Sequence, residues 1–269
     1  LIDLKEDGSF RLNMKYFNFA TGLTMTNEKF SKLFGQKVRD PSKELLTQFH
    51  MDIASSIQEV IEKIVLKLVK NIKEETKTKN LCLAGGVALN CVVNGKIVKN
   101  KIFESIWIQP ASGDAGGSLG AALAFWHQEL LKPRQISKSK DNMCGSYLGP
   151  QFSEKTIENI LNELNAKFTK CDRENLSDKV ANELNNGKIV GWFQGRMEFG
   201  PRALGCRSII ADPRSEKMQK DLNLKIKFRE SFRPFAPSIL REDLSDWFDL
   251  NCDSPYMLLV ANVKENIQI

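Results

Sequence analysis

The chain has 269 residues, of which 42% are hydrophobic and 27% charged; this is an ordinary soluble composition, long enough for one large domain or two modest ones. No apolar run approaches the roughly 20 residues of a membrane helix, and the N-terminus shows no secretory signal, which argues against a membrane partner. The formal net charge of +6 fits small anionic ligands such as nucleotides better than nucleic acid, because the lysines are spread through the whole sequence.

The cysteines and histidines restrict the compartment and the metal chemistry. The six cysteines are scattered without a C-x-x-C pair, so we interpret them as reduced thiols of a cytoplasmic protein, not as a disulfide frame or zinc site. Only two histidines, His50 and His127, are present, which excludes a self-contained multi-histidine metal site. Because the chain opens at Leu1 without methionine and closes soon after a strand-like run, we expect a piece of a longer protein.

The first region begins with a strand-turn-strand pattern around Asp7-Gly8. A long amphipathic helix follows, with Asp40 predicted as its N-cap and Pro41 at its first position. Its apolar residues recur at steps of three and four from Leu46 to Ile72. His50 lies within this helix, and we interpret it as a core-edge histidine rather than a ligand.

Two units of strand, glycine loop and helix come next. Buried strands are predicted at residues 81–84 and 105–109, and helices at 87–99 and 118–131, with glycine-rich loops between them. This arrangement is typical of an α/β fold with parallel strands. Ligands in such folds lie beyond the carboxyl ends of the strands, where both glycine loops are expected.

A polar segment without periodicity, residues 133–146, is the predicted linker to a second region. Helices with serine caps are predicted at 153–164 and 177–187, a strand at 188–195, a helix at 216–228, an extended segment at 232–240 and a strand at 257–263. These elements are expected to form a second region, separate from the first.

The first glycine loop, "AGGVALN", holds Gly85, Gly86 and Asn90. Glycines let a backbone approach a ligand closely, and the following helix offers unpaired N–H groups. The alternative is a tight turn in which the glycines only relieve crowding. The Asn90 amide needs a partner, which is either backbone or a ligand.

The second glycine loop, "ASGDAGGSLGAA", places Asp114 between Gly113 and Gly116 at the exit of a buried strand. A carboxylate there can coordinate a metal or accept a hydrogen bond from a hydroxyl; the alternative is that Asp114 caps the next helix. The run of small residues from Gly116 to Ala122 predicts a helix packed tightly against a neighbour.

The charge anomaly lies between Arg196 and Arg241, which includes seven of the eleven arginines. "GRMEFGPRALGCRSI" places three of them on loop and turn backbone, and "KFRESFRPFAPS" adds three more cations. Because phenylalanines and prolines alternate with these cations, we expect a partly desolvated cluster that needs anions. Arginine suits bidentate phosphate binding, and a compact, glycine-lined cluster favours a small phosphorylated ligand over nucleic acid.

Four motifs, "LCLAGGVALNCVVNGK", "PASGDAGGSLGAAL", "GRMEFGPRALGCRSI" and "FRESFRPFAPSIL", resemble in order and spacing the NodU/CmcH family of ATP-dependent O-carbamoyltransferases. The resemblance implies the second half of an actin/sugar-kinase-like (ASKHA) carbamoyl-transfer domain at residues 1–132. It also implies a truncated, YrdC-like α+β domain at residues 147–269 that forms carbamoyl-AMP from carbamoyl phosphate and ATP.

The resemblance also implies roles for single residues. Gly85, Gly86 and Asn90 would hold the adenylate together with Gly113 and Gly116, and Asp114 would be a ligand of a divalent metal, Fe(II) or Mg²⁺. The cations and the hydroxyl that would clamp carbamoyl phosphate and ATP are Arg196, Arg202, Arg207, Ser208, Lys227, Arg229 and Arg233. Preorganised guanidinium groups stabilise charge that develops on phosphates.

The expected activity is transfer of the carbamoyl group to a hydroxyl of a small, glycosylated acceptor by a carbamoyltransferase (EC 2.1.3.-) that could be a homodimer. Because family members are roughly twice this length, the fragment alone is expected to be inactive. Two alternatives stay open: a carbamoyl-adenylate enzyme that acts on a protein thiol or tRNA, and a non-catalytic nucleotide-binding module. A pure ATP sensor would not need the arginine segment.

Overall fold

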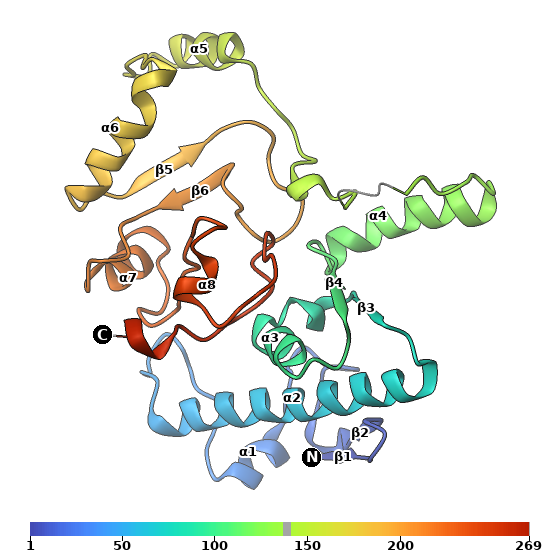
Figure 1. The fold of residues 1–269 in the computed structure, drawn as a ribbon. Helices are drawn as coiled ribbons and strands as arrows, with labels where there is room; N and C mark the ends of the chain where they lie inside the picture. The colour runs from blue at the N-terminus through green and yellow to red at the C-terminus, as the bar shows by residue number, and fades with distance from the viewer. Residues whose placement is uncertain (137–140, 269) are drawn as a thin grey trace. The chain divides into compact units, whose positions relative to one another are not determined.

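The computed structural model describes residues 1–136 and 141–268 (Figure 1). Helices alternate with short strands, which form three two-stranded sheets within these residues, so the chain is a mixed α/β protein as predicted. It divides into two compact units: unit 1 is Leu1–Cys82 with Val92–Trp107, and unit 2 is Leu83–Cys91 with Ile108–Ile269. The predicted domains, 1–132 and 147–269, stay a prediction, and residues 137–140 of the predicted linker lie outside the described residues.

Unit 1 begins with the predicted pair of strands. Strands β1 (Ile2–Leu4) and β2 (Phe10–Leu12) are antiparallel, with Ile2 opposite Leu12. Their turn packs against a helix, because a Cβ on Gly8 would lie 2.5 Å from the Leu68 nitrogen. Gly8 also has a φ of +87°, so only glycine fits this turn without strain. Two short elements follow, η1 (Met14–Tyr16) and α1 (Glu28–Phe34).

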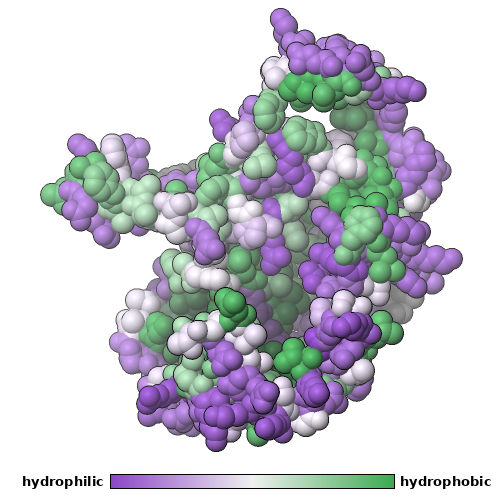
Figure 2. Space-filling model, turned by 180° about the vertical axis from the view of Figure 1, so that it is seen from behind, coloured by the Kyte–Doolittle hydropathy of each residue, from purple (hydrophilic) through white to green (hydrophobic). Residues whose placement is uncertain are grey.

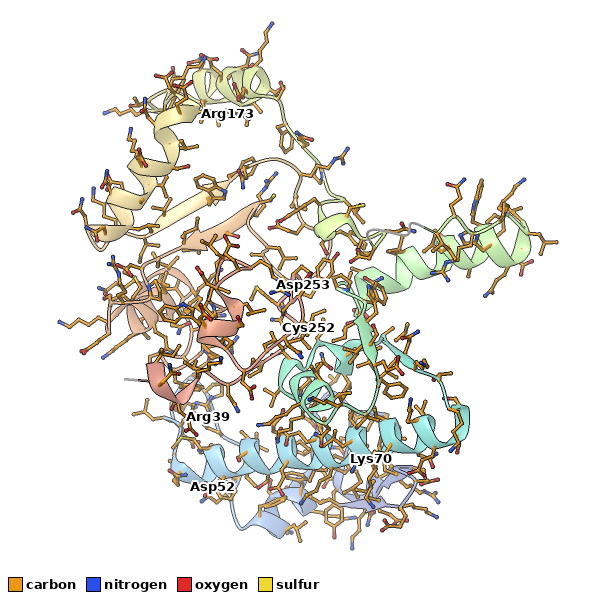
Figure 3. All side chains as sticks on the ribbon, viewed as in Figure 1. Arg39, Asp52, Lys70, Arg173, Cys252 and Asp253 are labelled. Atoms are coloured by element: carbon orange, nitrogen blue, oxygen red, sulfur yellow. The ribbon has the colours of Figure 1, made fainter. Side chains whose placement is uncertain are left out.

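The long helix α2 (Gln48–Thr76) starts later than predicted, because Thr47 and not Asp40 is its N-cap. The Asp40 carboxylate instead accepts a hydrogen bond from the Ser42 backbone N–H, which makes a local turn. Arg39, labelled in Figure 3, closes the same segment by donating to the Glu44 carbonyl. His50 is half-buried and accepts the Thr47 backbone N–H at 3.0 Å, so it also has a capping role that the pattern did not indicate.

Helix α2 carries the core of unit 1 together with α3 (Cys91–Lys99). Ile64 and Val69 of α2 are buried, as are Val93 and Ile97 of α3. An ion pair joins Glu62 to Lys96, and the hydrogen bond from Lys96 lowers the pKa of Glu62. A buried carboxylate needs such a partner, so this pair fixes the register of the two helices.

Strands β3 (Asn80–Leu83) and β4 (Ser105–Ile108) pair with each other, as predicted. The Glu104 N–H donates to the Lys79 carbonyl and the Gln109 N–H to the Leu83 carbonyl, which is the order of a parallel pair. The predicted helix 87–99 is interrupted at Asn90, where the turn η2 (Gly86–Leu89) ends and α3 starts.

Unit 2 contains most of the remaining elements. These are α4 (Asp114–Ala124), η3 (Phe125–Glu129), η4 (Cys144–Ser146), α5 (Glu154–Glu163), α6 (Arg173–Asn185), β5 (Val190–Phe193), β6 (Arg207–Ile210), α7 (Met218–Asp221), η5 (Leu222–Ile226), α8 (Leu244–Trp247) and η6 (Glu265–Ile267). Ser153 caps α5 as predicted. The next helix begins after Asp172, five residues before the predicted cap Ser177. Aspartate and serine are both common at the N-cap position, so the sequence does not decide between them.

Strands β5 and β6 form an antiparallel hairpin with Val190 opposite Ile210 and Phe193 opposite Arg207. Arg207 is therefore on a strand and not on loop backbone, which corrects the prediction. The predicted strand 257–263 is wrong. Within the described residues this segment has only a single bridge, between Phe248 and Val263, and the Val260 N–H bonds the Cys91 carbonyl instead of a strand.

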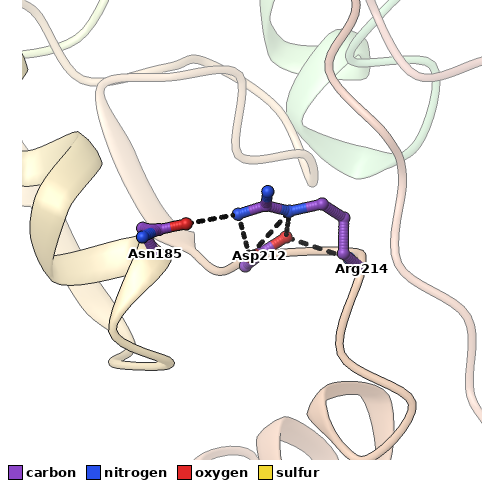
Figure 4. A network of polar contacts seen from close by, with 3 residues as sticks. All are labelled: Asn185, Asp212 and Arg214. Atoms are coloured by element: carbon purple, nitrogen blue, oxygen red, sulfur yellow. Dashed lines mark hydrogen bonds and ion pairs between the residues drawn. The ribbon is translucent and has the colours of Figure 1, made fainter.

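A polar network ties the end of α6 to the turn after β6 (Figure 4). The Arg214 guanidinium contacts both carboxylate oxygens of Asp212, with its closest bond at 2.7 Å, and donates to the Asn185 side chain at 2.9 Å. These contacts lower the pKa of Asp212 and raise that of Arg214. The network lies at the surface, so we assign it a positioning role and not a large share of stability.

Hydrophobic side chains reach the surface in many places (Figure 2). The end of α4 and the turn after it expose Phe125, Trp126 and Leu131. None of the helices in the described part of the chain is both long and apolar enough to cross a membrane. Exposed apolar residues of this kind are normal in folded proteins.

Tyr256 anchors the C-terminal part of unit 2. Its buried hydroxyl donates to the Asp141 carboxylate at 2.8 Å and accepts the Gly145 N–H at 3.2 Å. Burial, and then the hydrogen bond with Asp141, raise the pKa of Tyr256 to about 12. The neutral phenol is thus the form that the fold stabilises.

We therefore expect Tyr256→Phe to lower the free energy of unfolding by about 2 kcal/mol at pH 8. The contribution is complete below pH 10, the ordinary pKa of tyrosine, and is lost as the pH rises through about 12. Urea unfolding from pH 8 to 12 measures this, with Tyr16→Phe as the control. A difference between wild type and Tyr256→Phe that does not shrink above pH 10 would contradict the assignment.

Candidate functional site

The first glycine loop lies in unit 2 and has an open side. No atom lies within 4 Å of a Cβ built on Gly85 or Gly86, so side-chain crowding does not explain these glycines, and the choice between a structural turn and a ligand loop stays open. Gly85 has a φ of +94°, a conformation that glycine adopts without strain. Asn90 is half-buried, and its N–H donates to the Val87 carbonyl as η2 ends.

The second glycine loop leads from β4 into α4. Gly113 is the N-cap of α4 and Asp114 is its first residue, so the alternative that Asp114 caps this helix is wrong. A Cβ on Gly116 would lie 2.0 Å from the Ala111 carbonyl oxygen, whereas Gly117 and Gly120 have no atom within 4 Å. Gly116 is thus close only to the loop that leads into its own helix, and α4 has no buried residue, so the predicted tight packing of this helix against a neighbour is wrong.

Asp114 is exposed at the start of α4. Within the described residues, no group of three His, Cys, Asp or Glu side chains is arranged to hold a metal ion. The described residues therefore do not assemble a metal centre of three such side chains, and the metal-binding role of Asp114 stays a prediction.

The loop between β5 and β6, residues 194–206, contacts both glycine loops within unit 2. Gly200 lies against the second loop, because a Cβ there would be 3.3 Å from the Ala111 Cβ and the Pro110 oxygen. Arg202 reaches the first loop and donates to the Leu89 carbonyl at 3.3 Å. Three segments that the sequence singled out separately therefore meet in one place.

Arg202 is the cation at this meeting point. Its side chain is half-buried, and its Nε is buried without a hydrogen-bond partner among the described residues. Buried polar groups normally have partners. Since the guanidinium has donors left after the bond to Leu89, Arg202 can bind an anion next to the first glycine loop.

The other two arginines of this segment bond to backbone. Arg196 is exposed and donates to the Gly149 carbonyl at 2.9 Å. Arg207 donates to the carbonyls of Gln194, Gly195 and Cys206, and its guanidinium lies 3.5 Å from the centre of the Phe193 ring. The Ser208 hydroxyl accepts the Gly205 N–H at 2.9 Å, so Arg207 and Ser208 both bond within their own hairpin.

The second set of cations lies around the buried Asn223. Arg229 donates to the Asn223 side chain at 2.7 Å, and Asn223 donates to the Arg233 carbonyl at 2.8 Å. The Arg233 guanidinium pairs with Glu230, and Lys227 is exposed. Among the described residues, no hydrogen bond or ion pair joins this set to the arginines of residues 196–207.

The expected desolvation of the whole cluster is wrong for residues 227–235. Phe228 is 85% exposed and Phe232 is 64% exposed, so these rings do not shield the cations from water. Only Phe235 lies against a guanidinium, 5.0 Å from that of Arg229. The alternation of aromatic and basic residues indicated burial, but this segment turns repeatedly, with Phe228 at a positive φ and the Arg233 N–H bonded to the Glu230 carbonyl, and leaves these two rings in solvent.

Glu198 is a buried residue that the sequence analysis missed. Its Oε1 accepts the backbone N–H groups of Leu204 at 2.6 Å, Cys206 at 2.8 Å and Arg207 at 3.3 Å. Burial alone would raise the pKa of Glu198, but these donors outweigh it and lower the pKa. In the sequence, Glu198 is one acidic residue among three arginines. A surface ion pair gives the same pattern, so the pattern did not indicate that Glu198 is buried.

Two models of known protein families match this chain, one over the glycine loops and one over the arginine segments. Residues 1–123, which include both glycine loops, match the model "Carbamoyltransferase N-terminus". Residues 181–268, which include both arginine segments, match "Carbamoyltransferase C-terminus". The chain belongs to the carbamoyltransferase family. The resemblance to the NodU/CmcH group is thereby confirmed.

Individual relatives in this family are longer than the chain. It is 58% identical over its whole length to the uncharacterized protein sll1178 of Synechocystis, of which it covers 44%. It is 42% identical over 81% of its length to the nodulation protein NolO of Bradyrhizobium diazoefficiens, of which it covers 40%. It is 28% identical over 92% of its length to nodulation protein U of Azorhizobium caulinodans, covering 40%. The chain thus spans less than half the length of these relatives.

Proposed function

We propose that the protein is an ATP-dependent O-carbamoyltransferase. In this proposal it converts carbamoyl phosphate and ATP into carbamoyl-AMP and passes the carbamoyl group to a hydroxyl of a small-molecule acceptor. The observation that carries the proposal is that the half-buried Arg202 donates to the Leu89 carbonyl in the first glycine loop and has donors left for a ligand. Membership of the carbamoyltransferase family supports the type of reaction.

The proposed chemistry has three steps. Carbamoyl phosphate is first hydrolysed, so that carbamate and phosphate form. A carbamate oxygen then attacks the α-phosphorus of ATP, which forms carbamoyl-AMP and releases pyrophosphate. The acceptor hydroxyl finally attacks the carbamoyl carbon, loses its proton and displaces AMP. The first two steps handle several phosphate charges, which a fixed guanidinium stabilises as they develop.

The residues of the site are proposed to divide this work. Gly85, Gly86 and Asn90 lie where an adenylate would be bound, and Arg202 would contact its phosphate. We further propose that the matched N-terminal part is ASKHA-like, that the C-terminal part is YrdC-like, and that Asp114 is one ligand of a divalent metal in the whole protein. The Arg229 set would bind a second phosphate group, because Lys227 and Arg233 are exposed beside it.

The test is a labelling experiment on the full-length protein. It is incubated with ATP and [14C]carbamoyl phosphate without acceptor, and the products are separated by chromatography. We expect labelled carbamoyl-AMP and one pyrophosphate per adenylate. Pyrophosphate release that does not depend on carbamoyl phosphate, or no labelled adenylate, would refute the mechanism.

A further inference from the structure

The turn that follows Arg202 has an unusual set of hydrogen bonds. Four successive backbone N–H groups, those of residues 204–207, all have partners nearby. Glu198 accepts three of them, and the Ser208 hydroxyl accepts that of Gly205. Successive N–H groups that converge in this way form an anion-binding concavity. Here the anion is the protein's own carboxylate.

The carbonyl side of the same loop is held by a cation. Arg207 donates to the carbonyls of Gln194 and Gly195 at the start of the loop and to that of Cys206 at its end. Glu198 thus accepts hydrogen bonds from N–H groups of the loop, and Arg207 donates hydrogen bonds to its carbonyl groups. Hydrogen bonds to an ionised group are about twice as strong as neutral ones, so the two together fix the loop from both ends.

We infer that Glu198 is a positioning residue, which sets the anion affinity of Arg202 by holding the loop between them. In the sequence, Arg202 lies between Glu198 and residues 204–207, whose N–H groups bond to Glu198. Among the described residues, no hydrogen bond or ion pair joins the Glu198 and Arg202 side chains, so the two residues are linked through the loop. Because Gly200 and Gly205 have positive φ values, this backbone has few barriers of its own against opening. Glu198 supplies the restraint that its glycines lack. The effect of Glu198 on anion affinity does not depend on the reaction. Only its importance for catalysis rests on the proposed function.

Glu198→Gln keeps an oxygen acceptor in place but removes its charge, so the three N–H bonds weaken and the loop is held less firmly. Removing a negative charge near a guanidinium should by electrostatics alone strengthen anion binding. Loss of positioning should instead weaken it, because the arginine must then be ordered when the ligand binds. Binding would also become stronger if the backbone N–H groups of residues 204–207 bound the ligand themselves. The direction of the change therefore decides between the explanations.

The experiment uses isothermal titration of the full-length protein with inorganic pyrophosphate. We expect Glu198→Gln to raise the Kd about tenfold, with Glu216→Gln as the control, since Glu216 is exposed and the substitution changes the net charge equally. In an Arg202→Lys background, Glu198→Gln should add less than about twofold, because residues that act through each other are not additive. Melting temperatures within a few degrees show that each variant is folded.

Several results would overturn the inference. An unchanged or lower Kd for Glu198→Gln is one, and full additivity with Arg202→Lys is another. If Glu198→Gln does not fold, Glu198→Asp, which keeps the charge on a shorter side chain, is titrated instead with the same expectation. Failure of the proposed function gives a different pattern: the pyrophosphate results hold, but wild-type protein makes no carbamoyl-AMP.

Discussion

Arg202→Ala is expected to lower kcat/KM for carbamoyl-AMP formation by about 10²- to 10³-fold, the range seen when one fixed donor to a developing charge is removed. Arg202 is half-buried and contacts the first glycine loop through its bond to the Leu89 carbonyl. In the variant, water that fills the space of the lost side chain carries no positive charge to stabilise the phosphates. We expect a small effect on folding, because a single bond at 3.3 Å is lost. Carbamoyl-phosphate-dependent pyrophosphate release measures the effect.

Arg241→Ala is the matched control for this experiment. Arg241 pairs with Asp253, labelled in Figure 3, and both side chains are exposed. The substitution therefore removes an arginine and an ion pair without changing the glycine loops. Its kcat/KM should stay within about twofold of wild type, since exposed ion pairs contribute little. Equal losses in the two variants, or activity of Arg202→Ala within threefold of wild type, would rule out the role of Arg202.

The arginine segments show how far sequence patterns reach. The motif "GRMEFGPRALGCRSI" predicted an irregular backbone with several arginines, and the structure has such a loop. The motif did not predict which arginine keeps hydrogen-bond donors that are free to bind a ligand. Arg207 alternates with the same apolar letters as Arg202, yet it bonds to backbone carbonyls of its own hairpin. That difference depends on how the loop folds back, which is not a local property of the sequence.

The strands and helices were predictable where the periodic pattern was strong. Strand β3 and the amphipathic helix α2 were expected from their apolar residues, although only Leu81 of β3 is buried, so the predicted burial of the whole strand is wrong. The start of α2 was missed because Asp40 and Thr47 are both good caps, and the choice between them depends on tertiary packing. The apolar run 257–263 failed as a strand for the same reason, since a strand needs a partner that local sequence does not show.

Gly116→Ala is expected to lower the free energy of unfolding by about 3 kcal/mol, the range of serious overpacking. The new Cβ would lie 2.0 Å from the Ala111 carbonyl oxygen and 3.0 Å from its carbon. These are backbone atoms, so either α4 or the loop before it must shift. That loop also carries the contact with Gly200, so we expect carbamoyl-AMP formation to fall as well.

Gly117→Ala provides the opposite expectation one residue along the same helix. No atom lies within 4 Å of a Cβ there, so alanine should stabilise α4 by about 0.5–1 kcal/mol through helix propensity alone. Urea unfolding of both variants against wild type measures the two effects. Destabilisation by both substitutions would mean that the helix is covered along its length. Tolerance of both would mean that the close approach of Gly116 to Ala111 does not hold in solution.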